Sequence, residues 1–67
     1  MKIDGQQLKK FRELRGFSTR QLAQRIGVQH STIVRWERGE ADPRPQHVRA
    51  LAYALHVGIH KFAEVSA

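Results

Sequence analysis

The segment Ser18–Gly39 reads STRQLAQRIGVQHSTIVRWERG, and its pattern predicts two short helices joined by a tight turn. Apolar residues recur at helical spacing in each half of the segment. Gly27 lies between the two halves, and glycine adopts the positive φ of such a turn at little steric cost. We therefore expect one helix over residues 19–26 and a second helix over residues 29–38.

The apolar side chains of this segment are expected to hold the two helices at a steep angle. Ala23 lies where the facing helix must approach closely, because a larger side chain there would push the pair apart. Two short helices packed in this way form a helix-turn-helix, here over about residues 19–38. The side chains expected to point inward are Leu22, Ile26, Val28, Ile33 and Trp36.

Three further helices are predicted over residues 5–15, over residues 45–55 and over a short stretch beginning at Ile59. Asp4 and Gln7 have the spacing of a capping box, and Pro45 suits the first turn of a helix. The chain is therefore expected to be all-α, with five short helices around one core in a single domain over residues 1–67. The apolar faces of the three helices are expected to comprise Leu8, Phe11, Leu14 or Arg15, Val48, Leu51, Ala52, Leu55, Ile59, Phe62 and Ala63.

The composition excludes several classes of protein. The chain has 67 residues and no cysteine, so neither disulfides nor thiolate metal sites are expected. No apolar run approaches the roughly 18 residues of a membrane span, and the start MKIDGQQLKK lacks the apolar region of a secretory signal. We expect no membrane partner and a cytoplasmic, nucleoid-associated location.

The sequence shows no pattern typical of an enzyme. There is no Ser/His/Asp set, no carboxylate pair suited to acid–base chemistry and no phosphate-binding glycine loop. His56 and His60 are four residues apart, but Gly58 stands between them where a helix is expected to start. Neither catalytic activity, nor a cofactor, nor a metal site is therefore expected.

The positive charge is concentrated in the first part of the chain. The formal net charge is +6, and residues 1–39 hold nine Lys or Arg against three Asp or Glu. Residues 40–67 hold three of each sign. A one-sided positive field attracts polyanions such as nucleic acid, although charge alone also leaves open a basic surface without a partner.

The chain resembles the phage-repressor type of helix-turn-helix domain, the Cro and lambda-repressor-like (XRE) family. The matching stretches are LKKFRELRGFSTRQLAQRIGVQHSTIVRWERG and DPRPQHVRALAYALHVGIHKF, and the resemblance extends over roughly Asp4 to Phe62. Residues at the family's spacing are Leu22, Ala23, Gly27, Val28, Ile33, Trp36, Glu37 and Gly39. The resemblance implies a sequence-specific regulator of transcription, a repressor, that binds double-stranded DNA as a homodimer on a two-fold operator. Half-sites would lie about 34 Å apart.

The resemblance also implies which residues contact DNA. The helix over residues 29–38 would enter the major groove, where Arg35 suits guanine and Val34 suits the methyl group of thymine. Two alternatives stay open: His30 as an ordinary exposed residue and Val34 as part of the core edge. The implied base contacts are Gln29, His30, Ser31, Val34 and Arg35, and the expected phosphate contacts are Thr19, Arg20, Arg38 and Arg44.

Arg12 and Glu37 occupy positions that form an ion pair in the family, between the first and third helices. Were the pair exposed, it would contribute only about 0–1 kcal/mol, and its main effect would be to hold the third helix in place. The alternative is two unrelated surface charges.

A second interpretation of the sequence is that the chain is a protein-interaction module. The chain would then be the antitoxin of a toxin–antitoxin pair, or a subunit that docks on a protein partner through the C-terminal helix and the tail HKFAEVSA. The resemblance also implies weak dimerisation through the same stretch. Large exposed apolar side chains would be expected on residues 29–38 if that face bound protein, and His, Ser, Val and Arg occur there instead.

Overall fold

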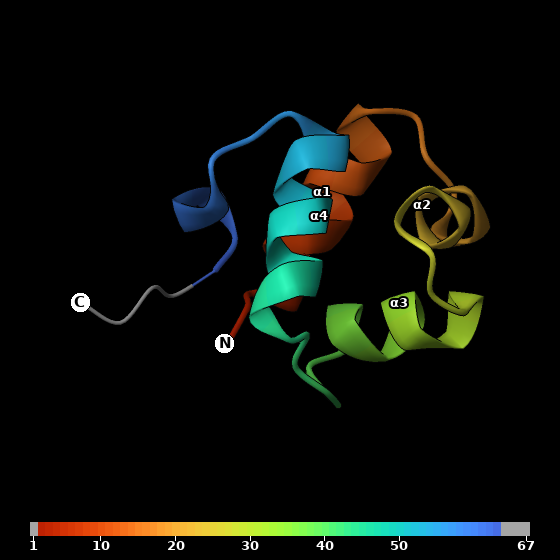
Figure 1. Cartoon of the computed structure of the whole chain (residues 1–67), viewed down its shortest axis with the longest axis horizontal. Helices are drawn as coiled ribbons and strands as arrows, with labels where there is room; N and C mark the ends of the chain where they lie inside the picture. The colour runs from red at the N-terminus through yellow and green to blue at the C-terminus, as the bar shows by residue number, and fades with distance from the viewer. Residues whose placement is uncertain (1, 64–67) are drawn as a thin grey trace.

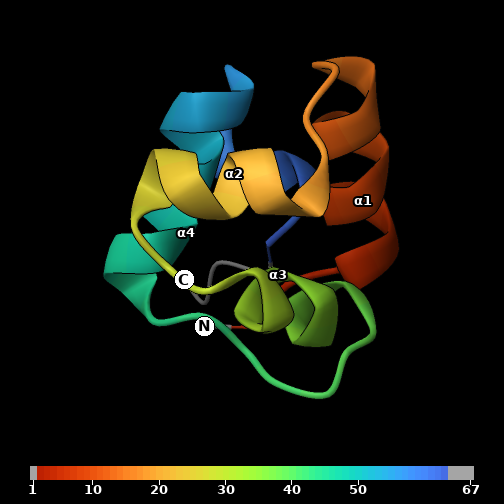
Figure 2. The same cartoon turned by 90° about the vertical axis from the view of Figure 1, so that its right-hand side faces the viewer.

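The computed structural model describes residues 2–63 of the chain. Over this range it contains four α-helices: α1 (Gly5–Leu14), α2 (Thr19–Ile26), α3 (His30–Glu37) and α4 (Pro45–Leu55). Figure 1 shows α2 and α3 on one side of α1 and α4. Figure 2 shows α2 lying across α1 and α4, with α3 beside one end of these two helices. The all-α expectation is confirmed for the described residues, and each of these four helices begins and ends within one residue of its predicted bounds.

The prediction of a fifth helix is wrong. Ile59–Lys61 form a single turn of 3-10 helix, η1, and Phe62 then leaves the helical region with φ −138°. The cause is a competing backbone partner, because the N–H of Asp4 donates to the carbonyl of Phe62 at 2.6 Å. Ile3 and Ala63 also form an isolated antiparallel bridge. The two ends of the described chain therefore pair with each other.

The helix starts follow the capping signals only in part. The capping box at Ser18 is complete, since each backbone N–H of Ser18 and Gln21 donates to the side chain of the other, at 2.8 Å and 3.0 Å. Asp4 caps α1 through Oδ1, which accepts from the N–H groups of Gln6 and Gln7. The backbone N–H of Asp4 bonds to Phe62 instead of to the Gln7 side chain, so half of that predicted box is replaced.

The buried side chains form one hydrophobic cluster between the four helices. Leu14 is an exception to the predicted pattern, because it is 69% exposed and α1 packs through Leu8 and the half-buried Phe11. No helix within residues 2–63 is both long enough and apolar enough to cross a membrane. The cluster consists of Ile3, Leu8, Leu22, Ala23, Ile33, Trp36, Val48, Leu51, Ala52, Leu55, Phe62 and Ala63.

The first residue of α1 lies directly against the end of α3. A Cβ atom added to Gly5 would meet the carbonyl oxygen of Trp36 and the carbonyl carbon of Glu37, each at 2.7 Å, and the carbonyl oxygen of Glu37 closer still. Real Cβ atoms essentially never approach backbone atoms this closely. Glycine at this position therefore allows the close approach of α1 and α3.

We expect Gly5→Ala to destabilise the protein by about 1–3 kcal/mol, because the added methyl group must push α1 away from α3. Urea unfolding followed by circular dichroism measures this change. Gln6→Ala is the control, since Gln6 is exposed on the same turn and its replacement is expected to change stability by less than about 0.5 kcal/mol. Equal stabilities of the two variants would contradict the close approach.

Candidate nucleic-acid interface

The α2–α3 pair is held by a glycine turn and by close packing. Gly27 ends α2 in the left-handed conformation, with φ 78°. The N–H groups of Gly27 and Val28 both donate to the carbonyl of Ala23, at 2.9 Å and 3.0 Å, while Ala23 itself is only 2% exposed. The predicted inward residues are buried or half-buried here. The turn and the small side chain together bring α3 close to α2.

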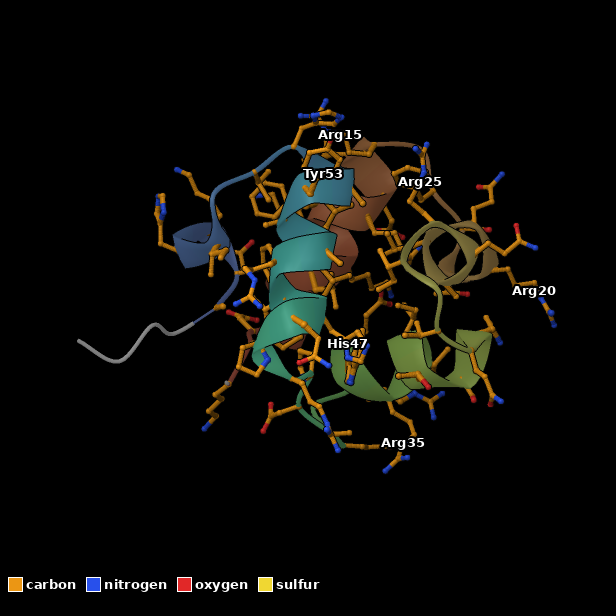
Figure 3. The ribbon with its side chains drawn as sticks, in the orientation of Figure 1. Arg15, Arg20, Arg25, Arg35, His47 and Tyr53 are labelled. Atoms are coloured by element: carbon orange, nitrogen blue, oxygen red, sulfur yellow. The ribbon has the colours of Figure 1, made fainter. Side chains whose placement is uncertain are left out.

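α3 has one buried face and one solvent-facing face. Ile33 and Trp36 are 0% and 3% exposed and anchor the helix in the core. Ser31 and Arg35 are exposed, and Arg35 points away from the body of the protein (Figure 3). His30 and Val34 are half-buried, so each presents part of its side chain to solvent and part to the protein.

Gln29 and Arg38 are the residues that cap α3. Gln29 is the N-cap, but its side chain makes no capping hydrogen bond and is exposed. Arg38 is the C-cap and is also exposed. Ser31, Arg35 and Arg38 follow the spacing i, i+4 and i+7, which places them along one face of the helix. The solvent-facing side of α3 thus carries hydroxyl and guanidinium donors along its length.

The other predicted phosphate contacts lie at the starts of α2 and α4. Thr19 is the first residue of α2 and is half-buried, and Arg20 beside it is exposed and projects outward (Figure 3). Arg44 stands at the N-cap of α4, yet its side chain makes no capping bond. The side chain of Arg44 therefore does not cap α4, and the residue is exposed.

Arg12 of α1 and Glu37 of α3 form a bidentate ion pair. Arg12 Nε donates to Glu37 Oε2 at 2.6 Å, and Nη2 donates to Oε1 at 3.2 Å. Arg12 Nη1 also donates to the carbonyl of Phe17 at 2.8 Å. Each side chain of the pair is only 9% exposed, so the energetic expectation for an exposed pair does not apply. A buried pair is costly to break, because the loss of either partner leaves the other charge unpaired and away from water.

Two contacts that hold α3 were not found from the sequence. Gly5 meets the C-terminal backbone of α3, as described above. His47 of α4, labelled in Figure 3, packs against Trp36 with the two rings tilted and their centroids 5.5 Å apart. Neither residue has a local signal, because both contacts join helices that are distant in sequence. Together with the Arg12 pair they fix the C-terminal end of α3.

The charges around α3 are largely unbalanced. Within residues 2–63, the contact of Arg12 with Glu37 is the one salt bridge. Arg20, Arg35 and Arg38 are all exposed and are not neutralised by carboxylates in this part of the chain. The outer side of α2 and α3 is therefore a positively charged surface that can attract a polyanion.

The chain matches a known protein family over most of its length. The family model for helix-turn-helix proteins matches residues 8–62. The chain belongs to the helix-turn-helix family, of the phage-repressor type. A helix-turn-helix protein of this type places α2 and α3 as the DNA-binding pair, and the family comprises DNA-binding regulators of transcription.

Solved helix-turn-helix structures resemble the chain over most of its length. The restriction-modification controller protein C.AhdI from Aeromonas hydrophila is 30% identical, with a TM-score of 0.80 over 85% of this chain and 86% of that one. SinR, the master regulator for biofilm formation solved with DNA, is 32% identical with a TM-score of 0.78, covering 84% and 90%. The P22 c2 repressor with a synthetic operator is 25% identical with a TM-score of 0.81, covering 88% and 89%.

A curated relative is similar over a shorter segment. A protein of Pyrococcus furiosus assigned as an HTH-type transcriptional regulatory protein is 42% identical over 40 residues, which is 60% of this chain. The aligned segment makes up 13% of that protein. The similarity therefore covers part of this chain and only a small part of the longer protein.

We expect Arg12→Met to cost about 3–5 kcal/mol, because it leaves the buried Glu37 carboxylate without its partner. Replacing both residues by methionine should recover much of this loss, since no unpaired buried charge remains. Urea unfolding of the two single variants and the double variant measures the coupling. Lys9→Met is the control on the exposed side of α1. Strictly additive losses in the double variant would contradict the pair's coupling.

Proposed function

We propose that this helix-turn-helix protein binds a specific double-stranded DNA sequence and regulates transcription, with α3 lying in the major groove. The observation that carries the proposal is the two-sided nature of α3. Its buried face, Ile33 and Trp36, fixes the helix, while its exposed face presents Ser31 and Arg35 to solvent. Those exposed groups contribute nothing to the core and are of the type that reads base edges.

The side chains along α3 suit different parts of the groove. Arg35 can donate two hydrogen bonds to the O6 and N7 atoms of guanine, a contact worth about 1–3 kcal/mol of discrimination between bases. Val34 offers an apolar surface for the methyl group of thymine. Gln29, His30 and Ser31 lie at the N-terminus of α3. The N-terminal residues of a recognition helix are the ones that lie nearest the base edges.

Phosphate contacts would come from residues around the helix pair. Arg38 at the end of α3 and Arg20 at the start of α2 are exposed cations, and Thr19 stands at the N-terminus of α2. Arg44 at the start of α4 is a further candidate, although Glu40 and Asp42 in the preceding loop oppose a strongly anionic partner there. Such contacts set orientation and dominate affinity without reading sequence.

The protein is proposed to act as a dimeric repressor on a two-fold operator. Support comes from its likeness to the P22 c2 repressor, solved with a synthetic operator, and to SinR, solved with DNA. Docking of a protein partner through the C-terminal segment is not favoured, because Phe62 and Ala63 are 1% and 9% exposed and belong to the core. Residues 64–67 of the expected tail lie outside the described residues.

We expect selection from random double-stranded DNA to enrich a two-fold motif, and Arg35→Ala to lose preference at one position of each half-site. The predicted loss of discrimination is about 1–3 kcal/mol at that position. Sequencing of the selected pools measures both effects. Binding without any enriched motif would contradict the proposal that α3 reads the DNA sequence.

We expect Arg38→Ala to weaken binding to all DNA sequences alike. The slope of log K against log salt should fall by about one unit, because one phosphate contact is lost. Fluorescence anisotropy at several salt concentrations measures this slope. Lys61→Ala removes the same charge from η1, on the side of α4 away from α2 and α3 (Figure 1), and should leave the slope unchanged. An equal effect of both variants would show that only overall charge matters.

A further inference from the structure

A hollow of about 400 Å³ lies between α2, α4 and the connection from α1 to α2. Arg15, Arg25 and Tyr53 gather there, at the end of the protein opposite to Arg35 (Figure 3). None of the predicted DNA-contacting residues lines it. The apolar part of the lining includes Phe17, Ile26 and Ala54, and Arg15 and Arg25 are its cationic residues.

Arg15 is held in place at one side of this hollow. Its Nε donates to the carbonyl of Leu55 at 2.7 Å, and its Nη2 donates to the carbonyl of His56 at 3.4 Å. These bonds tie the guanidinium to the C-terminal end of α4. A guanidinium has five N–H donors, so donors remain for a ligand on a side chain whose position is already fixed. A fixed cation loses less conformational freedom on binding than a mobile one.

Arg25 provides a second cation. Its guanidinium carbon lies 5.5 Å from the centre of the Phe17 ring, so the positive charge lies over an aromatic ring that lines the hollow. The sequences of the two helices that line the hollow, TRQLAQRI and PQHVRALAYAL, contain no acidic residue. Within residues 2–63, neither Arg15 nor Arg25 takes part in a salt bridge. The hollow therefore combines an apolar lining with unbalanced positive charge.

We propose that this hollow binds a small amphiphilic carboxylate. The ring or short aliphatic chain of the ligand would pack on Phe17, Ile26 and Ala54, and its carboxylate would bind at the rim that carries Arg15 and Arg25. Guanidinium groups form their strongest hydrogen bonds with carboxylates, and the volume lies in the range of small-ligand sites. A protein partner would need roughly 800 Å² of surface on each side, far more than one ring-sized hollow offers.

The test is a titration of the full ¹⁵N-labelled chain followed by the amide shifts of its NMR spectrum. The probes are indole-3-acetate and hexanoate, each compared with its neutral alcohol, indole-3-ethanol and 1-hexanol. Saturable shifts at Phe17, Arg25, Ile26 and Ala54 are expected with the carboxylates, and binding of the alcohols should be about tenfold weaker. Equal binding of acids and alcohols, no saturation by about 10 mM, or shifts confined to α3 would each overturn the proposal.

Two matched variants of α2 separate this site from DNA binding. Arg25→Gln should weaken binding of the carboxylates about tenfold and leave DNA binding unchanged. Arg20→Gln, on the same helix but outside the hollow, should weaken DNA binding and leave the carboxylate affinity unchanged. If Arg20→Gln reduces carboxylate binding as much as Arg25→Gln does, the anion binds through general charge and the proposal fails. A failure of DNA binding alone would leave the ligand site standing.

Discussion

The bidentate contact between Arg12 and Glu37 is the constraint on which the position of α3 depends. Both side chains are nine-tenths buried, and removing two charges from water is costly unless each meets the other with good geometry. The third hydrogen bond of Arg12, to the Phe17 carbonyl, ties the connection that precedes α2 to the same guanidinium. A shift of α3 along its axis or a rotation about it would break these bonds. One arginine of α1 thus bonds both to α3 and to the connection that leads into α2.

Most of the fold follows from signals that are local in the sequence. The complete capping box at Ser18, Pro45 in the first turn of α4 and the glycine after Ile26 each act within a few residues, and so the bounds of α2 and the start of α4 could be predicted. The expected fifth helix failed because the backbone of Phe62 bonds to Asp4, at the other end of the chain. The prediction that Leu14 belongs to the packed face of α1 was wrong, because it is exposed. Periodicity identifies the side of a helix that packs, but it does not show how far along the helix the packing extends.

The candidate site could be predicted only where the pattern and the family resemblance agreed. The exposed face of α3 follows from spacing, and its ion pair with Arg12 follows from the resemblance, whereas the burial of that pair does not. Gly5 and His47 carry no signal because their contacts are made across helices. Arg15 illustrates the same difficulty. The sequence offers it as an alternative to Leu14 on the apolar face of α1, and only the fold shows that it binds the end of α4.

The pairing of Ile3 with Ala63 has a consequence for how the chain reaches this structure. It closes a loop that contains nearly the whole described chain, and the entropy lost on closing a loop grows with its length. The contacts between α2 and α3, in contrast, join residues close in sequence and form at little entropic cost. The recognition pair is therefore suited to form early, and the seam between the two ends is suited to close last. Opening of the pairing between Ile3 and Ala63 would leave the contacts between α2 and α3 in place, because those contacts involve other residues of the chain.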